Sequence, residues 1–133
     1  MPRFVLLFHD CPSSFAKPSH WDLMLERGIA LMTWSLTALP LTWQKSDRVN
    51  NARHDLVEIM ATRLLDHRLA YLDYEGSVSG DRGRVSREDR GHYAIIAESS
   101  DALQVQLDGA WVKGRISLPI DQPPLAPELQ PTF

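Results

Sequence analysis

The sequence predicts a mainly β fold, an antiparallel barrel or sandwich. Two observations predict it: the chain holds many short runs that are apolar or alternate between apolar and polar residues, and glycine-containing turn signals separate them. Its 133 residues are the usual length of one domain. A composition of 44% hydrophobic and 23% charged residues is that of an ordinary globular protein and excludes a disordered chain.

The expected strands are read from these runs in order. They cover residues 3–8, 19–26, 29–36, 92–99, 102–107 and 110–118. Gly28 separates the second strand from the third, as in a hairpin, and turn signals at 89–91 and 108–109 bound the later strands. Residues 54–65 fit a helix or a strand. Asp66 is expected to cap a short helix over 67–74 that ends before Gly76.

The proline distribution predicts where the domain ends. Five of the nine prolines fall in residues 119–131. Proline cannot donate a backbone hydrogen bond, so this segment is expected to lie extended over the surface or to be mobile. We expect a domain over residues 1–118 and a Pro-rich tail over 119–133.

Charge and cysteine content exclude several classes of protein. The net charge of −3 excludes broad electrostatic adhesion to a polyanion, so any contact with nucleic acid is expected at a local site. Cys11 is the single cysteine, which excludes an internal disulfide and every multi-cysteine zinc motif. No apolar run is long enough for a membrane span or a secretory signal, and we expect a cytoplasmic protein without a membrane partner.

The alternating segment 19–26 carries the sharpest chemical signal. At strand spacing His20, Asp22 and Met24 point to the same side, and His9 ends the preceding strand. Two imidazoles and one carboxylate suit Mn²⁺, Fe²⁺ or Zn²⁺. The alternative is that His20 and Asp22 form the solvated face of a hairpin. Met24 is expected to point at the site rather than into the core.

A second set of candidates surrounds the predicted short helix. If residues 67–74 are helical, His67 and Tyr71 are i, i+4 neighbours that could donate to a phosphate oxygen or protonate a leaving group. The alternative is a packed Tyr71 and a surface His67. Arg84, in the Arg-rich turn 80–91, could line a phosphate site, although most of that turn fits a charged hairpin surface. Cys11 next to His9 is conceivable as a nucleophile, but spacing shows no third group to orient it.

Taken in order, these pieces resemble the 3′-phosphoesterase domain of bacterial DNA ligase D and its stand-alone relatives. The resemblance covers most of residues 3–118. It is carried by FVLLFHD, ending in His9-Asp10; by HWDLMLE over 20–26; by Thr33-Trp34; by DHRLAYLDYEG over 66–76; and by the turns Gly80–Gly83 and Asp89–Gly91.

The resemblance implies a small closed antiparallel β-barrel with one or two short helices and an open crescent-shaped site. It implies a divalent metal, typically Mn²⁺ with Zn²⁺ or another transition metal possible, held by His9, His20 and Asp22. His67 and Tyr71 match the residues that contact the phosphate and assist its transfer. The implied activity is removal of 3′-phosphates and 3′-ribonucleotides in DNA repair. The implied partners are primer–template DNA 3′ ends and a DNA ligase or polymerase of the same pathway.

Three departures separate this chain from the family pattern. Met24 stands where the family has an arginine, and the lysine after the family's Trp strand has no counterpart in Ser35–Leu39. The spacing from His9 to His20 is eleven residues, longer than is usual. A metal cage with a depleted phosphate clamp also fits a second hypothesis, in which a non-catalytic, metal-containing barrel binds DNA ends or a repair protein.

Overall fold

The structure is a computed structural model of the whole chain, and it describes residues 1–15, 18–43, 56–78, 80 and 82–120. These residues form a mainly β fold with two 3₁₀ turns and no α-helix among them. The elements are β1 Arg3–Asp10, β2 His20–Arg27, β3 Ala30–Leu36, η1 Leu41–Trp43, β4 Val57–Glu58, β5 Thr62–Arg68, η3 Leu69–Leu72, β6 Gly76–Ser77, β7 Arg84–Glu98, β8 Ala102–Gly109 and β9 Lys113–Pro119. Within those ranges no helix has the length and apolar character needed to cross a membrane.

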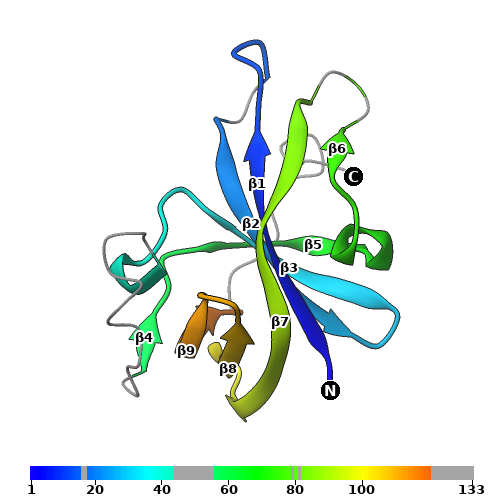
Figure 1. Cartoon of the computed structure of the whole chain (residues 1–133). Coiled ribbons are helices and arrows are strands. Elements are labelled where there is room, and N and C mark those ends of the chain that lie inside the picture. Colours follow the sequence, from blue (N-terminus) through cyan, green and yellow to red (C-terminus); the bar gives the residue numbers. More distant parts are fainter. Residues whose placement is uncertain (16–17, 44–55, 79, 81, 121–133) are drawn as a thin grey trace.

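The strands form one sheet that curls into a half-barrel (Figure 1). Its strand order is β4-β9-β8-β7-β1-β2-β3-β5, with β6 paired to β7, and all pairs except β4–β9 are antiparallel. The two ends of this order, β4 and β5, are consecutive strands linked only by Ile59–Ala61. The chain itself therefore joins the two edges of the sheet, and the prediction of a mainly β, barrel-like fold is confirmed.

Strand alternation gives the central sheet two buried faces. One face holds the main core, to which β1 contributes Phe4 and Leu6 and β3 contributes Trp34. The second face holds a smaller apolar cluster, and burial of side chains of this size stabilises the fold by about 1.5–3 kcal/mol each. Its members are Val5, Leu7, Met24, Leu31, Tyr71, Leu72, Val78 and Val85. His9, His20 and Asp22 continue this second face toward one end of the sheet.

The expected short helix over 67–74 is wrong. Strand β5 continues through Asp66 to Arg68, because its ladder with β3 pairs His67 with Leu31 and Arg68 with Ala30. The backbone of Arg68 is still extended, and no side chain caps the 3₁₀ turn η3 that follows it. Sheet pairing has overridden the local capping signal at Asp66. The open alternative for residues 54–65 resolves to strands over the described part, in β4 and the start of β5.

The expected turn at 89–91 is also wrong, because β7 runs without interruption from Arg84 to Glu98. Glycine is needed at position 91 because β8 approaches closely, and a Cβ there would overlap the Asp108 carbonyl. Asp89 instead accepts backbone hydrogen bonds from residues 110–112, so the last strand begins at Lys113 and not at 110. Residues 121–133 of the expected tail lie outside the described residues.

Candidate metal centre

His9, His20 and Asp22 lie together at one end of the sheet, where β1 ends and β2 begins. The antiparallel ladder pairs His9 directly with His20, and alternation along β2 turns Asp22 to the same face. Their side chains are 0%, 1% and 0% exposed. His9 Nδ1 is 3.8 Å from one carboxylate oxygen of Asp22, and His20 Nε2 is 3.2 Å from the other. Two histidine nitrogens and a carboxylate therefore converge in a buried place.

Backbone carbonyls fix the tautomer of both histidines. His9 Nε2 donates to the carbonyl of Arg82 at 2.6 Å, and His20 Nδ1 donates to the carbonyl of Pro18 at 2.9 Å. A carbonyl oxygen can only accept, so in each neutral ring the proton is on the nitrogen that faces away from Asp22. The lone pairs of His9 Nδ1 and His20 Nε2 are thereby turned toward the carboxylate, as in metal sites where a second hydrogen bond orients each histidine.

This donor set fits a divalent cation. His20 Nε2 and both carboxylate oxygens of Asp22 are buried and make no hydrogen bond. A buried carboxylate that no donor satisfies costs several kcal/mol, and nitrogen lone pairs facing it add repulsion. A cation between these atoms would remove both costs. Imidazole nitrogens with one carboxylate are ligands for Mn²⁺, Fe²⁺ and Zn²⁺.

The turn between β6 and β7 holds the His9 side of the centre. Gly83 has a φ of +93°, and a Cβ there would overlap the carbonyl oxygen of Asp10. Only glycine allows this close approach to the end of β1. The approach brings the Arg82 carbonyl to His9, which gives the glycine-rich turn of the sequence a structural reason. This turn and the β1–β2 loop lie at the same end of the sheet (Figure 1).

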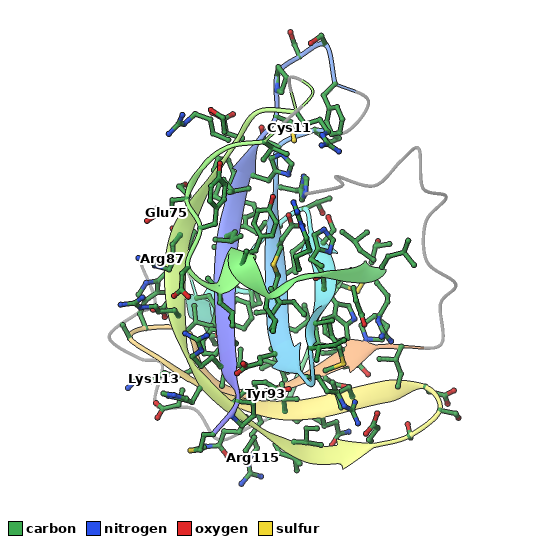
Figure 2. The ribbon with its side chains drawn as sticks, turned by 90° about the vertical axis from the view of Figure 1, so that its right-hand side faces the viewer. Cys11, Glu75, Arg87, Tyr93, Lys113 and Arg115 are labelled. Carbon is green, nitrogen blue, oxygen red and sulfur yellow. The ribbon has the colours of Figure 1, made fainter. Side chains whose placement is uncertain are left out.

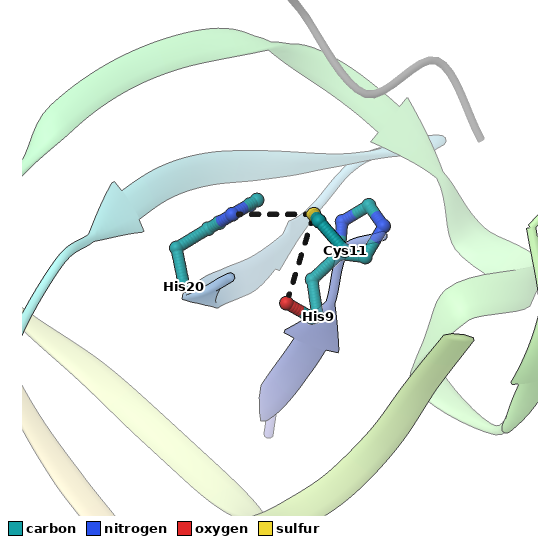
Figure 3. Close-up of side chains that lie close together, drawn as sticks. All are labelled: His9, Cys11 and His20. Carbon is teal, nitrogen blue, oxygen red and sulfur yellow. Dashed lines mark hydrogen bonds between the residues drawn. The ribbon is translucent and has the colours of Figure 1, made fainter. Parts of the chain in front are cut away.

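Cys11 also borders the centre, a position that sequence reasoning treated only as a possible nucleophile. Ligand atoms of His9, Cys11 and His20 all lie within 4.8 Å of one another. The Cys11 sulfur is 4.0 Å from His20 Nδ1 and 3.8 Å from the His9 carbonyl oxygen (Figure 3). Cys11 lies just beyond the end of β1, and its separation of two residues from His9 is the signal that could have found it. Figure 2 shows Cys11 at the opposite end of the molecule from Tyr93 and Arg115.

His67 and Tyr71 lie farther along the same face. The pairing of His67 with Leu31 puts His67 on the same face of the sheet as Asp22. His67 lies two side-chain rows from Asp22 along the strands, at roughly 7 Å per row. His67 Nδ1 donates to the Leu65 carbonyl at 2.8 Å. Both side chains are 7% exposed, so His67 is not the surface residue that the alternative interpretation expected, whereas Tyr71 is packed in the apolar cluster, as that interpretation expected. Their predicted i, i+4 arrangement is wrong, since His67 is in a strand; their catalytic roles stay predictions.

Met24 occupies the row between Asp22 and the Leu31–His67 pair, and the expectation that it points into a polar site is wrong. Its side chain is fully buried and packs in the apolar cluster that includes Val5 and Tyr71. The face is the expected one, but Met24 belongs to the apolar cluster, in the row between Asp22 and His67. A thioether suits this place because it fills apolar space without a partner.

Arg84 lies away from the converging histidines. Its guanidinium is exposed and donates to Ser77 Oγ at 3.2 Å. In the ladder between β1 and β7, Val85 pairs with His9 and Arg84 pairs with Asp10, so alternation turns Arg84 to the opposite side. The phosphate-binding role of Arg84 stays a prediction. It would require the start of β7 to rotate so that the Arg84 side chain faces the histidines.

Comparison with known proteins places the chain in one family. No curated protein matches it. The family described as the DNA Ligase D 3'-phosphoesterase domain matches residues 12–120, well over half of the chain. His20, Asp22, His67 and Tyr71 lie inside the matched range, whereas His9 precedes it and joins the centre through its pairing with β2. The chain therefore belongs to the DNA ligase D 3′-phosphoesterase domain family.

Proposed function

We propose that this protein is a divalent-metal-dependent phosphoesterase that acts on 3′ ends of DNA, removing a 3′-phosphate or a 3′-ribonucleotide during repair. The observation that carries the proposal is the buried His20–Asp22 pair, whose facing atoms make no hydrogen bond. Membership of the 3′-phosphoesterase family supports the reaction class. The proposed partners are primer–template 3′ ends and a ligase or polymerase of the same pathway.

In this proposal His9, His20 and Asp22 hold the ion. Mn²⁺ is proposed because the family resemblance implies it, and the carboxylate and imidazole donors can bind it. When bound, the ion supplies a positive charge that polarises a phosphoryl oxygen. Burial keeps water from competing for these ligands, and the carbonyls of Arg82 and Pro18 keep the two rings in the binding orientation.

His67 is the group assigned to the phosphate. The Leu65 carbonyl holds the proton on Nδ1, so Nε2 is the atom that gains and loses a proton. A protonated Nε2 donates to a phosphoryl oxygen or to the leaving oxygen, and the Tyr71 phenol is the second donor. His67 shares the face of Asp22, two side-chain rows away, and the buried Met24 occupies the row between them.

The test is release of phosphate from a 3′-phosphorylated primer–template, with Mn²⁺, with Zn²⁺ and with a chelator. We expect metal-dependent release that His67→Ala lowers about a hundredfold or more, while metal affinity stays within about twofold. His20→Ala should weaken metal binding at least tenfold. His92→Ala, an exposed histidine of β7, is the matched control and should change neither. If His67→Ala also loses the metal, His67 is a ligand and the assignment fails.

A second function has its own support. Met24 is buried among apolar side chains where the family has an arginine, and Arg84 faces away from His9. Both observations favour weak phosphate binding, as in a non-catalytic barrel that binds DNA ends or a repair protein. In the same assay this function gives a protein that binds metal and a primer–template end but releases no phosphate under any metal.

A further inference from the structure

We propose that Cys11 is a thiolate ligand for thiophilic divalent ions such as Zn²⁺ or Co²⁺. In this proposal Cys11, His9 and His20 form a soft donor set that competes with the harder set containing Asp22. The inference rests on the metal centre of the proposed function and concerns which ion the centre takes. Its consequence is that a single cysteine sets the metal preference of the protein.

The distances are close to those that a shared ion requires. With Zn–S near 2.3 Å and Zn–N near 2.0–2.1 Å, tetrahedral geometry separates sulfur from nitrogen by about 3.6 Å. The Cys11 sulfur is 4.0 Å from His20 Nδ1, and the ligand atoms of the three residues lie within 4.8 Å of one another. Binding therefore requires the Cys11 sulfur and His20 Nδ1 to approach one another by about 0.4 Å, and the most widely spaced pair of donors by at most about 1.5 Å. In Figure 3 the sulfur lies between the two histidine side chains.

Local hydrogen bonds hold the cysteine at this place. The Cys11 backbone amide donates to Ser19 Oγ at 2.9 Å, which joins the two ends of the β1–β2 loop beside the histidines. The same hydroxyl donates to Asp10 at 3.3 Å. Cys11 is partly buried, so a bound ion would be screened from solvent without being sealed from it.

The two donor sets share both His9 and His20, and the single lone pair of each ring makes the sets exclude one another. Asp22 lies 3.2 Å from Nε2, and Cys11 lies 4.0 Å from Nδ1, on the other side of the ring. A neutral imidazole has one lone pair, so it serves one ion at a time. A hard ion such as Mn²⁺ uses Nε2 with Asp22. A soft ion uses Nδ1 with Cys11, since thiolate strongly favours Zn²⁺ and Co²⁺ over Mn²⁺.

The protons balance in this exchange. The thiol loses its proton to solvent as the sulfur–metal bond forms. The Nδ1 proton of His20 leaves the Pro18 carbonyl, and the ring takes its proton at Nε2 instead. That atom then donates to Asp22, whose oxygen is 3.2 Å away and otherwise makes no hydrogen bond. When a soft ion binds, Asp22 therefore accepts a hydrogen bond from His20 instead of binding a metal ion.

The experiment compares the full-length protein with Cys11→Ser, which removes the only thiol, and with Ser14→Ala as a loop control. Titration with Co²⁺ is followed by the near-ultraviolet charge-transfer band of a cobalt–thiolate bond, and Zn²⁺ and Mn²⁺ affinities are measured by calorimetry. We expect the band in the wild type and in Ser14→Ala but not in Cys11→Ser. Zn²⁺ affinity should fall at least tenfold in Cys11→Ser, with Mn²⁺ affinity within twofold.

Alkylation of the wild type gives an independent measurement that needs no variant. Zn²⁺ should protect Cys11 from iodoacetamide, and Mn²⁺ should not. Absence of the cobalt–thiolate band, or equal protection by both ions, overturns the role of Cys11. If Mn²⁺ still binds in that case, the proposed function stands. A wild type that binds neither ion would instead overturn the metal centre, and the inference with it.

Discussion

Two buried carboxylates of this protein, Asp22 and Asp89, differ in the hydrogen bonds that they accept. Both lie on strands that flank β1, and they are 0% and 6% exposed. Asp89 accepts hydrogen bonds from the backbone amides of residues 90, 110, 111 and 112 at 2.8–3.1 Å. Asp22 makes none and faces two imidazoles. A buried charge that the chain satisfies by itself is structural, whereas one left unsatisfied indicates a ligand.

The ladder explains why the two groups differ. Asp22 pairs with Leu7 and lies on the face of the small cluster, whereas Asp89 pairs with Leu6 and lies on the face of the main core. A β-bulge in β7 puts Asp89 there, because Leu6 and Leu7 pair with residues 89 and 87 and leave Glu88 as the extra residue. The bulge aims the carboxylate at the amides before β9.

Loss of the Asp22 carboxylate should have the largest effect, and it should fall on metal binding. Asp22→Ala is expected to weaken Mn²⁺ binding about a thousandfold, roughly 4 kcal/mol, because the only anionic ligand of the hard donor set is removed. The free energy of unfolding without metal should change little, since the loss of packing is offset by removal of an unsatisfied buried charge. Calorimetric titration and urea denaturation measure the two quantities. A variant that binds Mn²⁺ normally would remove Asp22 from the ligand set.

Loss of the Asp89 carboxylate should show the reverse pattern. Asp89→Ala is expected to lower the free energy of unfolding by about 3 kcal/mol, because one buried and three partly buried amides lose their acceptor. Mn²⁺ affinity should stay within twofold. Asp89→Asn, which keeps one acceptor oxygen, should fall between wild type and Asp89→Ala in urea denaturation. Equal stability of all three proteins would show that water replaces the carboxylate.

A new charge at Met24 tests how far the polar part of the Asp22 face extends. Met24→Arg should lower the free energy of unfolding by about 2 kcal/mol, because its guanidinium must enter a cluster of buried apolar side chains. Met24→Leu, of similar volume, should cost less than about 1.5 kcal/mol and is the matched control. Wild-type stability together with tighter binding of a 3′-phosphorylated DNA end would show that the cluster opens to admit a charge.

The sequence predicts correctly the features that depend only on strand alternation, such as which residues share a face of the sheet. It put His20 and Asp22 on one face, and the ladder does the same, since the period of a strand is a local property. It failed at Asp66, Asp89 and Met24, where partners distant in the chain decide the outcome. Asp89 resembled a turn residue because three of its four amide donors, at residues 110–112, are distant in the chain. Met24 shares the predicted face, but only the fold shows that Tyr71 packs in the same cluster.

Tyr93 extends the comparison to a neutral buried group on the strand of Asp89 and has the smallest expected effect. Its hydroxyl donates to the Glu26 carbonyl at 2.6 Å, so Tyr93→Phe should cost about 1 kcal/mol at neutral pH. Burial raises the pKa of the phenol above its ordinary value of 10.0, and the nearby Arg27 guanidinium partly opposes that rise. The unfolded chain therefore ionises first, and the stability contributed by Tyr93 is present below pH 10.0 and lost as the pH rises toward the folded pKa. Urea denaturation of wild type and Tyr93→Phe at pH about 8 and about 11 measures this difference. The gap between the two proteins should narrow at the higher pH, and a gap that stays constant would mean that the phenol is not desolvated as its burial indicates.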